Sequence, residues 1–385
     1  MTSSSLSDGQ EMALALVPIP FAVISIISSA LLIRMQYRAL YGRLCDKTSE
    51  DDQCQCFPRI RSAALGDGSG GTERASTSVE VDNAPFRRII LIMSAYDVLN
   101  SITVACGPFV MPKDSSPRIW ASGNDQTCAA WGFFFQFNYP SLMYYGVLSF
   151  YFLTRIRFNM KDSYFGRRIE PILHVFVIGF TAITASIGAG LHFYGEIFPG
   201  PACWLAPQPY CDESCVERLE WVFGGWVVIL VWLFLIVNNI YIFFYVRNTI
   251  RRSQRRRSSL TMESQEARIR AVAIQAFLYV VVFMMTYIWT IILRLSDNDS
   301  TDGKELEARL FPVMMLRAVF LPLMGFGNLL VYSRPRYYQK RAKCPDLSRW
   351  GVIRSVLLEE TAEDSNLKSS RGRDSGSNLP PGDQG

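Results

Sequence analysis

The chain has 385 residues, of which 49% are hydrophobic and 19% are charged, and its formal net charge is +5. Soluble domains usually carry about 25% charged residues, and here the charges gather in a few stretches. This composition argues against a soluble enzyme, a collagen-like rod and a disordered chain. His174 and His192 are the only histidines, which argues against most chemistry that needs clustered imidazoles. We expect no enzymatic activity, no cofactor, no bound metal and no nucleic-acid partner.

Seven runs of more than twenty residues are apolar and nearly free of charge. A helix needs about 20 apolar residues to cross the hydrocarbon layer of a membrane, whereas barrel strands would alternate over about ten residues. The sequence therefore predicts an all-α membrane protein, a bundle of seven transmembrane helices. The predicted spans are residues 13–33, 89–112, 128–154, 171–195, 221–246, 271–293 and 310–333.

Basic residues predict the direction of the bundle, because cytoplasmic loops carry an excess of Lys and Arg. The loops after the third and fifth spans hold thirteen of them, and those after the second, fourth and sixth spans hold six. An odd number of spans places the termini on opposite sides. We therefore expect the N-terminus outside and the C-terminus in the cytoplasm of a multi-pass protein, with the plasma membrane as its location. The first span is expected to act as its own signal anchor.

The segments outside the spans differ in composition. We expect residues 1–12 to form the outer N-terminus, without a separate binding domain. Residues 35–87 are expected to form a long inner loop with a Gly-rich linker. Residues 334–362 are expected to form interfacial, juxtamembrane helices. Residues 363–385 are Ser-, Gly- and Pro-rich and predict a disordered cytoplasmic tail.

Two further features agree with this direction. A sequon follows the sixth span and predicts an outer glycan on Asn298. The outer loop after the fourth span holds Cys203, Cys211 and Cys215, and Cys128 begins the third span at the outer edge. An oxidising exterior permits these cysteines to pair.

Local motifs narrow the class of membrane protein. Residues 323–328 read Leu-Met-Gly-Phe-Gly-Asn, similar to the Leu-Gln-Gly-Phe-Phe-Asn signature of cAMP-receptor-like and secretin/adhesion-type receptors, with departures at Met324 and Gly327. Residues 203–205 are similar to the Cys-Trp element of those groups. Residues 331–337 resemble the end of span seven in cAMP-receptor-like receptors of microbial eukaryotes. The chain therefore resembles a G-protein-coupled receptor.

The resemblance implies a disulfide from Cys128 to Cys203 that holds the outer loop over the mouth of the bundle. Cys211 and Cys215 are alternates for that role, or they pair with each other. The resemblance also implies that a small extracellular ligand signals to a heterotrimeric G protein, with membrane lipid around the bundle and kinases and arrestin-like proteins as regulators. A seven-span small-solute transporter is the alternative. A microbial-type retinal protein is disfavoured because residues 310–333 contain no lysine.

Asp97 is the only acidic residue inside a predicted span, and a charge in lipid is costly to bury. It lies about 13 Å beyond Arg88, and Asn328 lies about 9 Å before Arg334, both counted from the inner face at 1.5 Å per residue. We expect Asp97 and Asn328 to meet through water or a cation in a polar core that rearranges on activation. A structural interhelical hydrogen bond is a compatible alternative.

Ligand contacts are expected in the outer part of the bundle. Arg317 lies about 12 Å along the membrane normal from Asp97, and there it would favour an anionic or carbonyl-bearing ligand. A snorkelling or backbone-bonded arginine explains its presence equally well. Aromatic residues of spans three and six are further candidates, although such side chains more often serve packing. These candidates are Trp131, Phe135, Tyr287 and Trp289.

The inner ends of the spans are expected to face the G protein. Arg155 and Arg157 end the third span, and Arg251 and Arg252 follow the fifth. The Asp-Arg-Tyr triplet of rhodopsin-like receptors is absent, so its ionic-lock mechanism is not carried over.

Three inner residues are candidates for modification. Arginines precede Ser258 and Ser259 in the pattern of a basophilic-kinase site, where phosphate would add about two negative charges. Cys344 follows a basic and aromatic stretch, which suggests palmitoylation. An unmodified cytosolic thiol is the alternative.

Overall fold

The structure is a computed structural model. It describes residues 6–46, 84–113, 120–197, 202–206, 211–255, 260–296 and 303–358. Asn298, Ser258, Ser259 and the predicted tail 363–385 lie outside the described residues, as does most of the predicted loop 35–87. The chain divides into two compact units, Met1–Leu329 and Leu330–Gly385.

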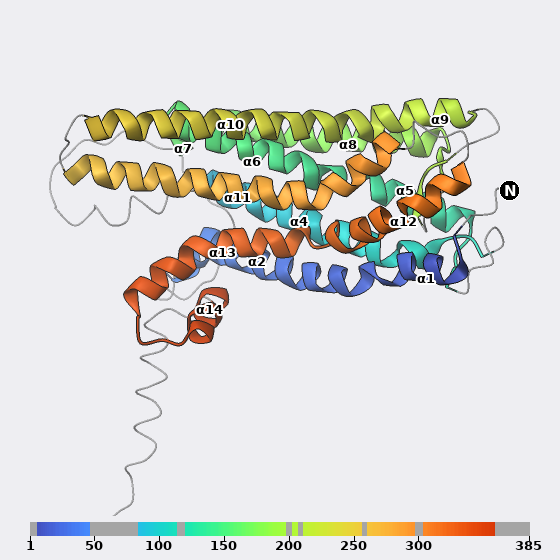
Figure 1. Ribbon diagram of the computed structural model, residues 1–385, viewed down its shortest axis with the longest axis horizontal. Coiled ribbons are helices and arrows are strands. Elements are labelled where there is room, and N and C mark those ends of the chain that lie inside the picture. The colour runs from blue at the N-terminus through green and yellow to red at the C-terminus, as the bar shows by residue number, and fades with distance from the viewer. Residues whose placement is uncertain are drawn as a thin grey trace, which may run out of the picture. The chain divides into compact units, whose positions relative to one another are not determined.

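The first unit is a bundle of long helices that run side by side (Figure 1). The helices as far as α13 are α1 (Asp8–Leu16), α2 (Pro18–Asp46), α4 (Ala84–Cys106), α5 (Asp125–Gln136), α6 (Tyr139–Arg157), α7 (Asp162–Tyr164), α8 (Glu170–Gly190), α9 (Glu213–Glu220), α10 (Trp226–Arg255), α11 (Leu260–Ser296), α12 (Gly303–Phe320) and α13 (Met324–Lys343). A 3-10 turn follows α4 at Gly107–Val110. π-Helical turns join α7 to α8 at Phe165–Ile169 and α9 to α10 at Trp221–Gly225.

Five helical runs in the described part of the chain are long and apolar enough to cross a membrane, or six if one bent pair is a single span. The runs are Asp8–Tyr41, Ala84–Val110, Asp162–Gly190, Ser214–Arg251 and Ile269–Ser296, and the bent pair is Ala308–Phe320 with Met324–Ala342. The remaining predicted span, 128–154, is covered by α5 and α6 together. The predicted all-α, seven-span fold class is thus confirmed, whereas the direction of the termini stays a prediction.

Prolines explain why the third and seventh spans are broken rather than continuous. A proline inside a helix lacks an N–H and clashes with the carbonyl group four residues earlier. α5 ends at Gln136, four residues before Pro140. The last span bends by 50° between α12 and α13, at the turn that contains Pro322. Hydropathy predicts the length of these spans but not the breaks.

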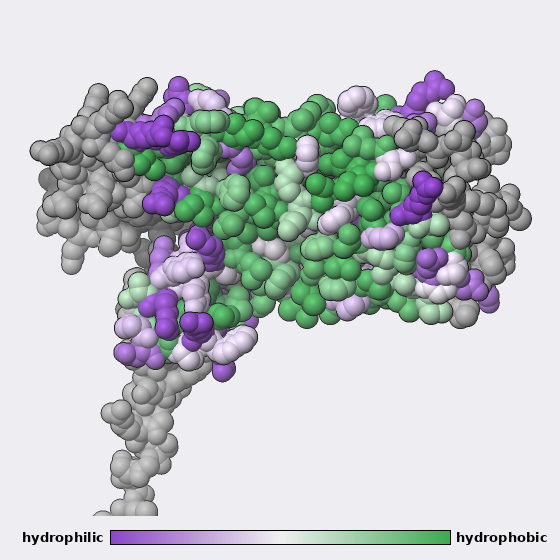
Figure 2. Space-filling view, viewed as in Figure 1, coloured by the Kyte–Doolittle hydropathy of each residue, from purple (hydrophilic) through white to green (hydrophobic). Residues whose placement is uncertain are grey.

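α6 forms the centre of the bundle. It contacts α4, α8, α10 and α11, and 13 of its 19 residues are buried. α8 and α10 instead present large apolar side chains outward, among them Val175 with 74% of its surface exposed. Figure 2 shows the same pattern on its visible face, where apolar residues cover the middle of the bundle and polar residues gather toward its ends. Such a surface is suited to lipid rather than water.

The fourth span ends earlier than the predicted residue 195. α8 stops at Gly190, and His192 adopts a left-handed conformation with φ 54°. Strand β1 (Tyr194–Ile197) then pairs antiparallel with β2 (Ala202–Leu205), and Glu196 lies opposite Cys203. The loop after the fourth span therefore includes a short hairpin.

The second unit contains the last turns of α13 and the helix α14 (Arg349–Leu357). The Arg336 guanidinium donates to the Tyr332 hydroxyl at 2.6 Å, and the Lys340 ammonium donates to the Ser355 carbonyl at 3.4 Å. α14 buries Val352 and exposes Trp350. An interfacial position for these helices stays a prediction.

Candidate functional site

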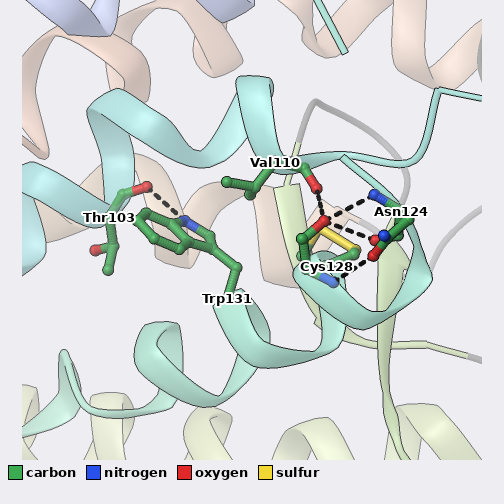
Figure 3. The surroundings of a disulfide bond; sticks show 7 residues. Thr103, Val110, Asn124, Cys128 and Trp131 are labelled. Atoms are coloured by element: carbon green, nitrogen blue, oxygen red, sulfur yellow. Dashed lines mark hydrogen bonds between the residues drawn. A yellow bond between two sulfur atoms is a disulfide. The ribbon is translucent and has the colours of Figure 1, made fainter. Parts of the chain in front are cut away.

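A disulfide joins Cys128, in the first turn of α5, to Cys203 in β2, with 5.4 Å between their Cα atoms. Both cysteines are buried against Met111 and Ala121. Asn124 caps α5 and accepts a hydrogen bond from the Thr127 backbone N–H, which fixes the helix start beside the disulfide (Figure 3). The structure therefore contains the pairing that the receptor resemblance implies.

The other two outer cysteines, Cys211 and Cys215, pair with each other. Between them, the Asp212 carboxylate caps α9 by accepting a hydrogen bond from the Cys215 N–H at 2.9 Å. That N–H, and then the Ser214 hydroxyl, lower the pKa of Asp212. This is one of the pairings that the sequence analysis left open, and neither cysteine takes the place of Cys203.

Gln136, the last residue of α5, ties the outer hairpin to the bundle. The Trp204 indole N–H donates to Gln136 Oε1 at 2.8 Å. The Gln136 amide in turn donates to the Thr184 hydroxyl and to the Phe223 carbonyl, both at 3.1 Å. Gln136 has no exposed surface. The sequence analysis missed this residue, although a lone glutamine inside the aromatic run of span three was a visible signal.

Charged and aromatic residues gather around Trp204. The Arg294 guanidinium forms an ion pair with Glu220 and lies over the Trp204 ring, 5.5 Å from its centroid. The Tyr139 ring packs against the Trp204 ring with 6.2 Å between centroids. We call Gln136, Tyr139, Trp204, Glu220 and Arg294 the outer cluster.

Arg317 of α12 lies within electrostatic range of the outer cluster. Its guanidinium interacts electrostatically with Arg294, Tyr139 and Tyr287. Its Nε atom is buried and has no hydrogen-bond partner within the part of the chain that the structure describes. The described residues show no hydrogen bond or ion pair between Arg317 and Asp97, as the depth estimate predicts. A buried donor without a partner is costly, so this guanidinium is suited to an added acceptor.

The four aromatic residues predicted to contact the ligand lie in different surroundings. Phe135 packs against Trp204 with 6.0 Å between centroids, beside the outer cluster. Tyr287 stacks on Phe283 at 4.8 Å, and Trp289 stacks on Phe320 of α12 at 5.8 Å. Trp131 instead points toward α4, where its indole N–H donates to the Thr103 carbonyl at 3.1 Å (Figure 3). Trp131 therefore serves packing near the disulfide.

Asp97 and Asn328 meet through a direct interhelical hydrogen bond, one of the two arrangements that the sequence analysis left open. The Asn328 amide donates to Asp97 Oδ2 at 2.8 Å, and the Tyr145 hydroxyl donates to Asn328 Oδ1 at 2.8 Å. The Ser141 hydroxyl donates to the other carboxylate oxygen of Asp97. All four residues are buried. We call these four residues the polar core; it links α4, α6 and α13.

Two glycines bring α13 close enough for this contact. A Cβ atom on Gly325 would lie 2.0 Å from the Ser29 hydroxyl oxygen and 3.0 Å from the Ser25 carbonyl oxygen. The Gly325 N–H donates to the Ser25 hydroxyl at 3.2 Å. A Cβ on Gly327 would lie 2.6 Å from Val282 Cγ1 on α11. The departure from the receptor signature at Gly327 therefore has a steric reason.

Gly327→Ala is expected to lower the free energy of unfolding by about 1–3 kcal/mol, because overpacking in a close-packed interior costs that much. The matched control is Gly179→Ala on α8, where an added Cβ meets nothing within 4 Å. That control should be neutral or slightly stabilising because alanine favours helix. Thermal unfolding of the two purified variants, followed by tryptophan fluorescence, measures the difference. Equal midpoints would contradict the close approach of α13 to α11.

The predicted G-protein-facing arginines make local contacts at the other end of the bundle. Arg155 pairs with Asp162 at 3.3 Å and donates to the Met160 carbonyl at 2.9 Å. Arg157 donates to the Tyr241 hydroxyl at 2.7 Å. Arg251 is exposed on α10. The side chain of Arg252 lies outside the described residues.

Cys344 follows α13 in the second unit and is a free, half-buried thiol. Its backbone N–H donates to the Lys340 carbonyl at 2.9 Å, which continues the last turn of the helix. A half-buried free thiol leaves palmitoylation a prediction.

Residues 209–324, a range that includes α9 to α12 and the first residue of α13, match the family described as serpentine type 7TM GPCR chemoreceptor Srv. The crystal structure of squid rhodopsin superposes with a TM-score of 0.56 at 13% identity, covering 99% of this chain and 95% of that chain. No curated protein sequence matches.

These likenesses bear on the class of protein rather than on its ligand. Neither is to the cAMP-receptor-like group, and neither supports the transporter alternative. The chain is a multi-pass membrane protein with the fold of the seven-helix G-protein-coupled receptors, and the two likenesses together support a receptor role.

Proposed function

We propose that the protein binds a small extracellular ligand and promotes nucleotide exchange on a heterotrimeric G protein at the cytoplasmic face of the plasma membrane. The family match to chemoreceptors suggests a diffusible chemical as the ligand. The glycine-containing motif at residues 323–328 favours the cAMP-receptor-like group within the receptor class. Enzymatic activity and cofactors have no part in this proposal.

The outer cluster and Arg317 are the proposed ligand contacts. Arg317 has a buried Nε atom without a partner in the described residues, and it lies within electrostatic range of the like-charged Arg294. Glu220 neutralises Arg294 through their ion pair. The excess positive charge therefore lies on Arg317, and an anionic or carbonyl-bearing ligand would supply the acceptor that it lacks.

One observation carries the mechanism: Arg317 and Asn328 belong to the two halves of the same broken span. α12 ends at Phe320 and α13 begins at Met324, with a bend of 50° between them. A ligand that draws Arg317 toward the outer cluster would change this bend and with it the contact of Asn328 with Asp97. Ligand binding then shifts the population between two packings of the bundle.

The inner surface is proposed to bind the G protein through Arg155, Arg157, Arg251 and Arg252. Arg155 and Arg157 are held by Asp162 and Tyr241 in this packing, and an active packing would release them. Phosphorylation of Ser258 and Ser259, palmitoylation of Cys344 and a glycan on Asn298 are proposed as modifications, and the first would recruit arrestin-like regulators.

The proposal is tested by nucleotide exchange on a panel of purified Gα subunits with the full chain in lipid nanodiscs. A library of small metabolites, both anionic and neutral, supplies the ligands. We expect at least one anionic metabolite to accelerate exchange. Uptake of a labelled metabolite into vesicles without any G protein, together with no exchange on any Gα subunit, would contradict the receptor function and favour transport.

Arg317→Gln is expected to weaken the response to an anionic activator about tenfold or more, because a hydrogen bond to a charged group contributes roughly 1.5–3 kcal/mol. Basal exchange should remain. The control is Arg309→Gln, which removes the same charge from an exposed position on the same helix. The concentration for half-maximal exchange is measured for both variants. Equal shifts in both would show that overall charge, rather than the position of Arg317, governs ligand binding.

A further inference from the structure

A cavity of about 660 Å³ lies between the inner ends of the second and fourth spans. Its wall is formed by the first turns of α4, by α7, by the π-helical turn after α7 and by the start of α8. The charged or titratable residues that line it are Arg88, Asp162, Arg167, Glu170 and His174. Apolar side chains, among them Ile92 and Pro171, complete the lining.

The acidic residues of this cavity already have basic partners. Arg88 holds Glu170 through two hydrogen bonds, at 2.7 Å to Oε1 and 2.6 Å to Oε2. Asp162 pairs with Arg155 at 3.3 Å and accepts from the Tyr151 hydroxyl at 3.0 Å. Both carboxylates are therefore compensated within the protein.

His174 lies beside the Arg88–Glu170 pair. Its Nδ1 lies 2.8 Å from the Tyr144 hydroxyl, and its Nε2 lies 3.4 Å from Glu170 Oε1. The Tyr144 hydroxyl and Glu170 therefore both engage the imidazole, and the Arg88–Glu170 pair is held in place from two sides. A fixed arrangement of this kind is suited to a defined ligand.

Arg167 is the uncompensated charge. It is exposed, and no ion pair or hydrogen bond of its side chain is found in the described part of the chain. Gly166, next to it, keeps the cavity open: a Cβ there would lie 2.8 Å from Arg88 Nη2 and 3.1 Å from Pro85 Cγ. The cavity therefore has one excess positive charge, on Arg167, whereas the carboxylates of Asp162 and Glu170 are already paired with arginines.

The apolar surface beyond the cavity indicates what fills it. Ile172, Val175 and Phe176 follow Pro171 on α8, and 61–74% of each residue's surface is exposed. They lie along the outward face of a helix in a lipid-facing span. This end of the bundle is the one that the arginine distribution predicts to be cytoplasmic, where membranes carry anionic lipids.

We propose that this cavity binds an anionic phospholipid of the inner leaflet. The phosphate lies against Arg167 and the solvent-exposed edge of Arg88. An acyl chain lies along Ile172, Val175 and Phe176. Basic pockets between transmembrane helices on the cytoplasmic side recognise lipid head groups in this way. The inference does not depend on the ligand or the G protein proposed above.

Native mass spectrometry of the full chain in mild detergent tests the proposal, with phosphatidylserine or phosphatidylcholine added. We expect phosphatidylserine to be retained in preference to phosphatidylcholine. Arg167→Gln should lower that retention about fivefold, because one arginine near an anionic surface contributes about 1 kcal/mol. Arg167→Lys should keep it. Arg168→Gln is the matched control, since Arg168 is exposed on the same turn but does not line the cavity.

A second variant fills the space without changing charge. Ser163 is exposed and lines the cavity, so Ser163→Trp should also lower retention of phosphatidylserine. Equal losses for Arg167→Gln and Arg168→Gln would mean diffuse attraction and would overturn the site. Unchanged retention of phosphatidylserine in both Arg167→Gln and Ser163→Trp would also overturn the site. Displacement of the lipid by inorganic phosphate alone would overturn it as well.

Discussion

Cys128→Ser together with Cys203→Ser is expected to lower the free energy of unfolding by about 4 kcal/mol, because the disulfide closes a loop of 75 residues. Both cysteines are buried in one apolar cluster with Met111 and Ala121. The loss also frees β2, so Trp204 would no longer be held against Gln136. The measurement is the thermal midpoint of the purified full chain, together with maleimide labelling of the released thiols.

Two controls separate this effect from the loss of cysteine itself. Cys211→Ser with Cys215→Ser removes a disulfide of sequence separation 4, so a much smaller loss is expected. Cys106→Ser alters a half-buried free thiol and should change little. Loss of the Cys211–Cys215 disulfide could not then lower the free energy of unfolding as much as loss of the Cys128–Cys203 disulfide. Equal losses would contradict the claim that closure of the hairpin onto α5 stabilises the bundle.

Asn328→Ala is expected to lower the free energy of unfolding by about 3 kcal/mol, because it removes two buried hydrogen bonds and leaves their partners unsatisfied. Asp97 loses its amide donor and the Tyr145 hydroxyl loses its acceptor. The matched control is Asn239→Ala on α10, whose amide, within the described part of the chain, donates to the Leu235 carbonyl of its own helix. Thermal unfolding in one detergent compares the two variants.

The same variant has a functional outcome. If the polar core holds α13 in the observed packing, Asn328→Ala should raise basal nucleotide exchange relative to Asn239→Ala. An Asn328 variant that is as stable as the Asn239 control, with the same basal exchange, would show that the polar core holds neither the fold nor the signalling equilibrium.

Depth along a helix was enough to predict one contact of the site. Asp97 and Asn328 lie at similar distances from charged residues at the inner face, and the structure joins them by a direct hydrogen bond. The sequence analysis left open whether they meet through water or a cation or through an interhelical hydrogen bond. It could not show that Gly325 and Gly327 let α13 approach α2 and α11 so closely, because the size of a gap depends on both helices.

The contacts between the hairpin and span three could not be predicted from the sequence. Trp131 and Phe135 belong to the same aromatic run, yet Trp131 bonds to α4 while Phe135 packs on Trp204. The break after Gln136 decides which helix each aromatic residue faces. The hydropathy of the sequence does not predict that break. The hairpin that brings Trp204 to Gln136 was likewise hidden, because the apolar run extends beyond the end of α8.

The direction of the chain through the membrane is the claim on which ligand binding outside, G-protein binding inside and the lipid site all depend. It is tested by labelling single cysteines with a membrane-impermeant maleimide in intact cells. The background replaces the five cysteines outside the two disulfides by serine: Cys45, Cys54, Cys56, Cys106 and Cys344. Into it are placed Gly9→Cys, near the N-terminus, and Arg251→Cys, on the inner end of α10; both positions are exposed.

An outer N-terminus and a cytoplasmic arginine-rich loop predict that Gly9→Cys is labelled in intact cells. Arg251→Cys should be labelled only after the cells are permeabilised. Labelling of Arg251→Cys in intact cells, with Gly9→Cys protected, would reverse the bundle. Labelling of both would place the two ends of the first five spans on one side, which would contradict the seven-helix receptor.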